Sequence, residues 1–172
     1  MKVNKDFLLI VDMQTGFGTA KDKRTISNCI TLIKYAVNKG IVPVFFYFEG
    51  YGRLVSQLQS LVDNLERDEK ELWHVWKYDN DGSEEFMDIF KKSYYEIGKV
   101  YACGVNLDAC VEDTCKGLKK FAVKDISILH DACNTNLYSF RSYEAAVNHS
   151  WKRLAFDKVI KYAVMNEVIG GK

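Results

Sequence analysis

Several features that mark particular classes of protein are missing from this sequence. No apolar run approaches the ~20 residues that a membrane-spanning helix needs, so we expect no membrane partner. An excess of charge of one sign is also missing, because 24 Lys and Arg face 23 Asp and Glu for a net charge of +1. Without a global field to attract it, nucleic acid is not an expected partner. The first residues, MKVNKDFLLIVDMQ, have too short an apolar part for a signal peptide and include Asp12.

Patterns that bind metals are absent as well. The five cysteines include no Cys-x-x-Cys pair, and the three histidines form no His-Glu-x-x-His motif. We therefore expect no structural zinc site, and no metal or other cofactor. An odd number of cysteines without a secretion signal favours reduced thiols and a cytoplasmic location. The cysteines are Cys29, Cys103, Cys110, Cys115 and Cys133.

The sequence contains instead a regular alternation of short apolar runs and amphipathic stretches. No repeat or linker interrupts it, so we expect residues 1–172 to form one domain. Continuous apolar runs predict buried strands, and apolar residues three and four apart predict helices. The predicted strands cover residues 7–11, 41–48, 72–76, 100–105, 126–129 and 159–162. The predicted helices cover residues 26–37, 54–65, 84–90 (with Ser83 as the N-cap), 111–122 and 143–156.

This alternation predicts an α/β protein with a three-layer, Rossmann-like fold. Right-handed crossovers place helices on both faces of a six-stranded parallel sheet. If the strand order is 3-2-1-4-5-6, the order reverses between the first and fourth strands, and ligands bind beyond the carboxyl ends of such strands. Asp12 follows the first strand, and the segment that leads to Cys110 follows the fourth. The two then face each other across this crevice.

Three of the five cysteines lie close together in VYACGVNLDACVEDTC, residues 100–115. Cys103 lies inside a predicted strand and Cys115 on an apolar helix stripe, so packing explains both. Cys110 differs, because it falls in the first turn of the predicted helix if Asn106 or Asp108 caps that helix. The helix dipole favours a thiolate there, and simple packing is the alternative.

Two charged residues adjoin predicted buried strands. Asp12 ends the first strand, where an unpartnered charge would be costly. Its alternative role is to cap the loop around Met13 and Gln14. Lys77 follows the apolar stretch 73–76 and precedes a polar loop, and its alternative is an ordinary solvated lysine. Neither residue identifies a reaction by itself.

Four segments together resemble the isochorismatase-like cysteine hydrolases over nearly the whole chain. They are LLIVDMQTGF, KYDNDGSEEF, CGVNLDACVEDT and LHDACNT. The resemblance implies a six-stranded parallel sheet and a catalytic triad of Asp12, Lys77 and Cys110. It also implies a cis peptide bond between Val105 and Asn106. The N–H of Asn106 would then point, with that of Cys110, toward a developing oxyanion.

The same resemblance implies a mechanism. Lys77 would help to lower the pKa of the Cys110 thiol, and Asp12 would accept its proton. The thiolate would attack a carbonyl carbon, backbone N–H groups would stabilise the oxyanion, and water would cleave the resulting thioester. Small amide, carbamoyl or ureido substrates suit this chemistry. The segment FYFEGYGR lacks the histidine of the metal motif that nicotinamidases of the family carry, so we do not expect a metal-dependent nicotinamidase.

Two other functions stay open. One is an isochorismatase-type vinyl-ether hydrolase that relies chiefly on Asp12, although Cys110 counts against it because true isochorismatases generally do not use the cysteine. The other is a binding or assembly member of the family with an unused triad.

The resemblance also implies a homo-oligomer, either a dimer or a tetramer. We expect five residues to bind a small-molecule substrate: Gln14, Phe17, Tyr51, Tyr78 and Tyr138. For the four aromatic residues among them, ordinary packing is an equal alternative.

Overall fold

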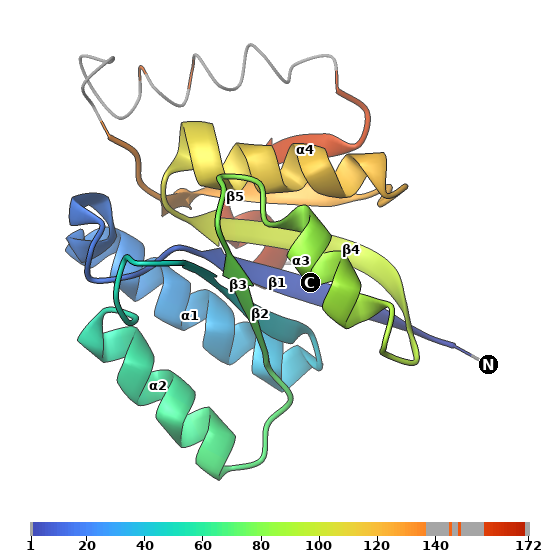
Figure 1. Cartoon of the computed structure of the whole chain (residues 1–172), viewed down its shortest axis with the longest axis horizontal. Coiled ribbons are helices and arrows are strands. Elements are labelled where there is room, and N and C mark those ends of the chain that lie inside the picture. The colour runs from blue at the N-terminus through green and yellow to red at the C-terminus, as the bar shows by residue number, and fades with distance from the viewer. Residues whose placement is uncertain (1, 137–144, 146–147, 149–156, 171–172) are drawn as a thin grey trace.

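The computed structural model describes residues 2–136, 145, 148 and 157–170 of the 172-residue chain. Its strands are β1 (Val3–Val11), β2 (Val42–Phe48), β3 (Trp73–Lys77), β4 (Tyr95–Gly104), β5 (Ile126–Cys133) and β6 (Ile160–Ala163). They form one sheet in the order β3-β2-β1-β4-β5-β6, and every neighbouring pair runs parallel (Figure 1). The predicted order 3-2-1-4-5-6 is confirmed.

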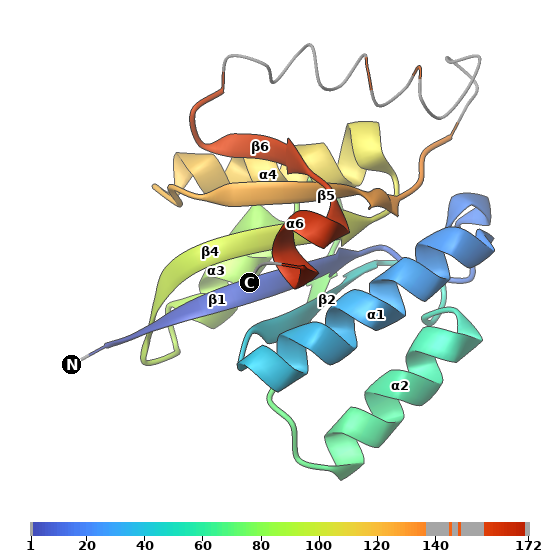
Figure 2. The same ribbon diagram turned by 180° about the vertical axis from the view of Figure 1, so that it is seen from behind.

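Helices lie on both faces of this sheet. They are η1 (Gly18–Lys21), α1 (Lys23–Lys39), α2 (Ser56–Arg67), α3 (Ser83–Phe90), the π-helical turn η2 (Leu107–Val111), α4 (Glu112–Lys120) and α6 (Met165–Ile169). Figure 1 shows α3 and α4 in front of the strands, and Figure 2, seen from behind, shows α1 and α6 on the other face. Within the described ranges, no helix has the length and apolar character needed to cross a membrane. Of the helix predicted over residues 143–156, the structure describes only residues 145 and 148, and both are helical.

Strand β1 runs through the middle of the sheet because its apolar residues can be covered on both faces. Residues Phe7 to Val11 are all buried, with at most 2% of each exposed. Leu9 pairs with Val44 of β2 on one side and with Ala102 of β4 on the other. A continuous apolar run of this kind is typical of a strand buried between two layers of helices.

Two boundary signals in the sequence have clear structural counterparts. Gly40 follows the last residue of α1 with a left-handed backbone, φ 70°, which glycine adopts without a steric penalty. Pro43 is the second residue of β2, and the pairing of β2 with β3 begins only at Val44. The missing N–H of the proline therefore costs no hydrogen bond to β3.

Strands β1 and β4 begin earlier than the apolar runs that predicted them, and β5 continues beyond its predicted run to Cys133. β1 begins at Val3 and β4 at Tyr95, and these first residues pair with each other. The added pairs continue to Lys5 opposite Ile97, and they are exposed or half-buried. Because these ends carry polar residues and lie outside the core, no continuous apolar pattern marks them in the sequence.

The predicted N-cap of α3 is wrong. The helix begins at Ser83 itself, Gly82 precedes it, and the Ser83 hydroxyl has no hydrogen-bond partner among the described residues. The Asp81 carboxylate accepts a hydrogen bond from the Ser83 N–H at 2.9 Å instead. The first N–H of the helix is therefore hydrogen-bonded by the side chain of Asp81, two residues before Ser83.

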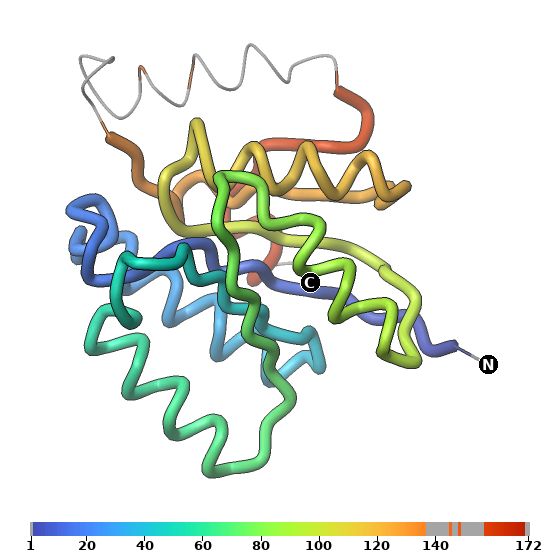
Figure 3. The backbone as a smooth tube through the Cα atoms, viewed as in Figure 1, coloured from blue at the N-terminus to red at the C-terminus, as the bar shows by residue number. Residues whose placement is uncertain are grey.

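The chain segments that follow β1, β2, β3 and β4 gather at one end of the sheet (Figure 3). This follows from the parallel arrangement, in which every strand points its carboxyl end the same way. Asp12, Lys77 and the η2 turn all lie at these strand ends.

Candidate active site

Asp12 is the first residue after β1, and it is completely buried. Its backbone is left-handed, with φ 53°, a conformation that aspartate adopts more readily than most residues. Its N–H donates to the carbonyl oxygen of Phe46 at 3.2 Å, and its own carbonyl oxygen accepts from the N–H of Gln14 at 2.7 Å. These contacts hold the carboxylate at the carboxyl edge of the sheet.

Lys77 is the last residue of β3, and it too is completely buried. Its Nζ lies 2.9 Å from Oδ2 of Asp12 and donates to the carbonyl oxygens of Asp79 and Asn80 at 2.9 and 3.2 Å. Apart from Lys77 and the Cys110 thiol, neither Asp12 oxygen has a partner among the described residues. Because an ion pair buried in this way is weak support for stability, a functional role is the better explanation.

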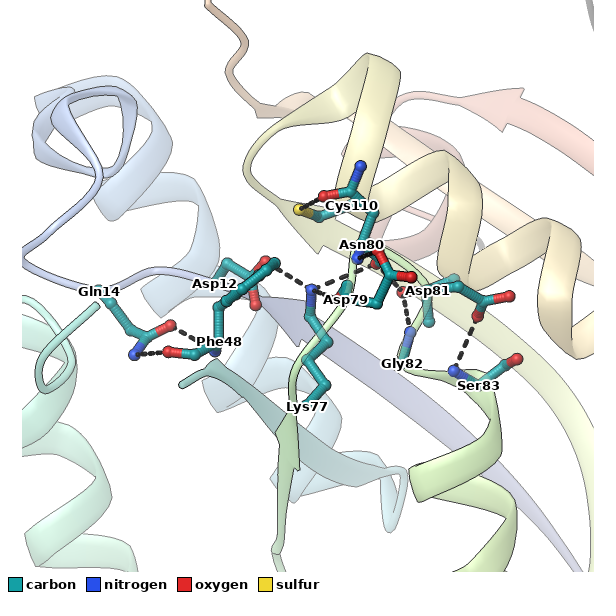
Figure 4. Close-up of polar contacts among 11 residues, drawn as sticks. Asp12, Gln14, Phe48, Lys77, Asp79, Asn80, Asp81, Gly82, Ser83 and Cys110 are labelled. Atoms are coloured by element: carbon teal, nitrogen blue, oxygen red, sulfur yellow. Dashed lines mark hydrogen bonds and ion pairs between the residues drawn. The ribbon is translucent and has the colours of Figure 1, made fainter. Parts of the chain in front are cut away.

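Cys110 lies in the η2 turn, and only 3% of it is exposed. Its thiol lies beside the Asp12 carboxylate, close enough for that charge to raise the thiol pKa, and its sulfur lies 3.4 Å from Oδ1 of Asn80. Figure 4 shows Asp12, Lys77 and Cys110 converging from three different elements. The structure therefore brings together the three residues that the sequence resemblance named.

The helix start around Cys110 differs in detail from the expectation. Neither Asn106 nor Asp108 caps the turn with its side chain. The carbonyl oxygen of Asn106 accepts from the N–H groups of Ala109 and Val111, which closes the turn. The Asp108 carboxylate accepts a hydrogen bond from the Thr135 hydroxyl.

The electrostatics of the site correct one sequence-based expectation. Burial and then the negative charge of Asp12 raise the pKa of the Cys110 thiol to about 12, while Lys77 and the Asn106 N–H lower it. Burial likewise raises the pKa of Asp12, and Lys77 opposes that rise. Lys77 lowers the thiol pKa as predicted, but the net shift is upward and a thiolate is not favoured, because a buried sulfur anion beside Asp12 is penalised more than Lys77 compensates. The thiol is neutral at neutral pH.

The segment between β4 and Cys110 points a hydrogen-bond donor at the sulfur. The Val105–Asn106 peptide bond is cis, as the resemblance implied. The N–H of Asn106 contacts the Cys110 sulfur, and its Oδ1 accepts from the Thr19 hydroxyl at 2.8 Å. The N–H of Val105 donates to the carbonyl oxygen of Val11 at 2.9 Å, which anchors the segment to the end of β1.

Two residues at the site were not predicted from the sequence. Asn80 contacts the sulfur through Oδ1, and its carbonyl oxygen accepts from the Thr114 hydroxyl at 3.2 Å. The same hydroxyl accepts from the N–H of Gly82 at 3.1 Å, so Thr114 ties the loop after β3 to α4. Asn80 lies in the segment KYDNDGSEEF, but no periodicity or spacing marks a polar loop residue of this kind.

Gln14, an expected substrate-binding residue, uses its amide within the protein. It is completely buried, its Nε2 donates to the carbonyl oxygens of Phe48 and Gly52 at 3.1 and 2.6 Å, and its Oε1 accepts from the Phe48 N–H at 2.7 Å. These bonds fix the loop after β2 and leave little capacity for a substrate. We therefore assign Gln14 a positioning role.

The expected aromatic residues are placed differently from one another. Phe17 and Tyr51 stack with ring centroids 4.2 Å apart, and both contact Phe48, whose ring centre lies 4.5 Å from Lys77 Nζ. This group therefore adjoins the buried ion pair. Tyr78 is 75% exposed, and Tyr138 lies outside the described residues.

The described part of the chain offers little for metal binding. It contains no group of three His, Cys, Asp or Glu side chains placed to hold a metal ion. All five cysteines are free thiols. The charged and nucleophilic groups that meet at this edge of the sheet are a carboxylate, an ammonium and a thiol.

Comparison with known proteins places this arrangement in context. No family model and no curated protein sequence matches the chain. Its structure is similar to a nicotinamidase from Staphylococcus aureus, with a TM-score of 0.70 and 18% identity over 92% of this chain and 98% of that one. It is also similar to a cysteine hydrolase from Pseudomonas syringae pv. phaseolicola, with a TM-score of 0.69 and 17% identity over 96% of this chain and 91% of that one. An isochorismatase from Pseudomonas putida gives a TM-score of 0.71 and 16% identity over 94% of this chain and 89% of that one. The chain therefore has the fold of the isochorismatase-like cysteine hydrolases and nicotinamidases.

Proposed function

We propose that the protein is a cysteine hydrolase that cleaves a C–N bond of a small amide, carbamoyl or ureido substrate. The reaction passes through a thioester on Cys110. The observation that carries this proposal is the meeting of a buried carboxylate, a buried ammonium 2.9 Å from it and a thiol in contact with the carboxylate. Because one fold hosts many functions, the argument rests on these side chains and not on the fold alone.

Asp12 takes the thiol proton as the sulfur attacks the carbonyl carbon of the substrate. A neutral thiol beside a carboxylate becomes a thiolate beside a neutral carboxylic acid, and Lys77 stays positive throughout. The total charge of the site is unchanged, which matters because a net charge would be costly at this depth. The raised pKa of the thiol keeps the sulfur neutral until a substrate is in place.

The later steps follow from the same groups. As the C–S bond forms, the carbonyl electron pair moves onto oxygen, where the backbone N–H groups of Asn106 and Cys110 stabilise it; one such donor is worth about 3 kcal/mol. The tetrahedral intermediate collapses, the C–N bond breaks, and Asp12 returns its proton to the leaving nitrogen. Water then attacks the thioester, Asp12 takes a proton from it, and Cys110 recovers its proton as the acid leaves.

The direct test is a screen for ammonia release from primary amides, ureas and carbamates, with nicotinamide included because structurally similar proteins are nicotinamidases. Cys110→Ala is expected to reduce turnover to background. Cys29→Ala is the matched control, since Cys29 is a buried thiol that contacts Cys103 and not the site. Turnover that survives in Cys110→Ala contradicts the proposal, and survival on a vinyl ether supports the isochorismatase-type alternative.

We also propose a setting for this activity. Cys110 must stay a free thiol to react, which favours a reducing, cytoplasmic compartment, and all five cysteines are free. The net charge of +1 favours a small-molecule substrate over nucleic acid or an anionic membrane. A homo-oligomer, dimer or tetramer, is expected from the sequence resemblance. Light scattering coupled to size-exclusion chromatography measures this directly, and a monomer would contradict it.

A further inference from the structure

The side chain of Asn80 contacts the sulfur, and no step of the mechanism above uses it. Its Oδ1 lies 3.4 Å from Sγ of Cys110 (Figure 4). Its main chain is fixed at two points, because its carbonyl oxygen accepts from Lys77 Nζ and from the Thr114 hydroxyl, both at 3.2 Å. Although Asn80 is an exposed residue, its loop holds it beside the reacting atoms.

The orientation of the Asn80 amide follows from its second partner. The Asn80 side chain also hydrogen-bonds to the carboxylate of Asp113 in α4. Only the NH₂ group can donate to a carboxylate, so the carbonyl end of the amide faces the other way, toward Cys110. The group that Asn80 presents to the sulfur is therefore an acceptor.

The groups around the sulfur match the polarity of an amide. The Asn106 N–H is a donor, and the Asp12 carboxylate and Asn80 Oδ1 are acceptors. A carboxamide carries one acceptor, its oxygen, and one donor group, its NH₂, whereas both oxygens of an ester are acceptors. A reacting carbon lies about 3–3.5 Å from its nucleophile before attack. Asn80 Oδ1 lies 3.4 Å from the same sulfur. The groups attached to the reacting carbon of the substrate therefore come within hydrogen-bonding reach of Asn80 Oδ1.

Proton transfer makes this contact matter. While the thiol is neutral, its S–H is within reach of Asp12 and of Asn80 Oδ1. Once the proton has passed to Asp12, the sulfur and Oδ1 are two acceptors that face each other, which is repulsive. An N–H of the leaving group supplies the missing donor, and an ester oxygen adds a third acceptor.

We propose that Asn80 determines specificity for the leaving group. Its Oδ1 accepts an N–H of the leaving nitrogen, so the site favours carboxamides, carbamoyl and ureido compounds over esters of the same acids. Sites that hydrogen-bond a substrate N–H discriminate strongly against analogues that lack it. This inference rests on the amide hydrolysis proposed above.

The test compares kcat/KM for two substrates of one acid: the primary amide that wild type turns over best in the ammonia screen, and its methyl ester. Asn80→Leu keeps the approximate size and removes the acceptor, whereas Asn80→Gln keeps both the acceptor and the donor of the amide. Asn38→Leu is the matched control, because Asn38 is exposed near the end of α1, away from the carboxyl edge. The amide-to-ester ratio is expected to fall about tenfold in Asn80→Leu, the size of one hydrogen bond. It is expected to stay at the wild-type value in Asn38→Leu and within about twofold of that value in Asn80→Gln.

Each other outcome has a definite meaning. Equal losses toward both substrates in Asn80→Leu overturn the inference, because a residue that only packs the loop would behave in that way. A ratio that also collapses in Asn80→Gln overturns it too. Should Asn80→Leu unfold, Asn80→Ala takes its place with the same expectation. A wild-type protein that is inactive on the entire panel refutes the proposed function and this inference with it, whereas an active one with an unchanged ratio refutes this inference alone.

Discussion

Replacing Asp12 with asparagine should separate the reactivity of the thiol from its use in catalysis. Asp12 raises the pKa of Cys110 through its negative charge and its contact with the thiol. Asp12→Asn removes that charge and leaves the Lys77 cation in place. We expect Cys110 to react faster with an alkylating agent, and turnover to be lost because no base remains to move the proton.

The size of the effect follows from simple electrostatics. A unit charge at about 4 Å contributes about 4 kcal/mol at an effective dielectric constant of about 20, which corresponds to about 3 pKa units. Applied to a thiol whose pKa is about 12, this lowers the value to about 9. At pH 8 the thiolate fraction then rises from about 10⁻⁴ to about 10⁻¹, so alkylation should accelerate by up to about 1,000-fold.

The assay is the rate of iodoacetamide labelling of Cys110 between pH 6 and pH 10, followed by peptide mass. Lys77→Met is the opposing variant, because it removes the charge that lowers the thiol pKa and should label more slowly than wild type. Cys110→Ser measures the background from the four other cysteines, all of which are buried.

The stability of the variant has to be measured alongside its reactivity. Asp12→Asn leaves the buried Lys77 ammonium without its counter-ion, which is expected to cost about 3–5 kcal/mol. If that variant unfolds, the double variant with Lys77→Met removes both charges together and provides a neutral site for the same comparison. Labelling of folded Asp12→Asn that is no faster than wild type would refute the conclusion that Asp12 holds the thiol pKa high.

Three further predictions concern the frame around the site. Gln14→Ala removes the three side-chain hydrogen bonds that brace the loop after β2, so the free energy of unfolding in urea should fall by about 2–4 kcal/mol. Gly104→Ala should lower the free energy of unfolding by about 2–4 kcal/mol, because Gly104 has φ 113° and a Cβ there would lie 2.8 Å from the Val11 nitrogen. An unchanged melting temperature would contradict this prediction. Lys119 lowers the pKa of Asp157 to about 2 from an ordinary 3.8, so the carboxylate stabilises the fold above pH 4 and loses that effect as the pH falls toward 2. Asp157→Asn should therefore be about 1–2 kcal/mol less stable than wild type at pH 7 and no less stable near pH 2, as urea titrations at both values would show.

The sheet and its order could be predicted because their signal is repetitive. Runs such as FLLIV in β1 are buried on both faces of the sheet. The residue that follows such a run lies at the carboxyl edge of the sheet, together with the residues that follow the other parallel strands. Asp12 and the segment that leads to Cys110 could therefore be placed opposite each other from the pattern, whereas Lys77 was added only by the family resemblance. The start of β4, from the half-buried Tyr95 onward, carries no such run, and the prediction began this strand only at residue 100.

The local chemistry could not be predicted in the same way. The direction of the Cys110 pKa depends on how deeply the sulfur is buried and on its closeness to Asp12, and neither follows from position in the chain. Asn80 reaches the sulfur through an irregular loop, where no period relates sequence to direction. Gln14 belongs to a recognised motif, yet only its contacts show that its amide serves the loop after β2.

The most direct test of the central claim is the mass of the peptide that contains Cys110 after a single turnover. Enzyme in excess over an amide substrate is quenched with acid while ammonia is being released, and the peptide is weighed. We expect a mass increase equal to the acyl group of the substrate on wild-type protein and none on Cys110→Ala. Ammonia release during that first turnover, with Cys110 still unmodified, would contradict a mechanism that passes through this sulfur.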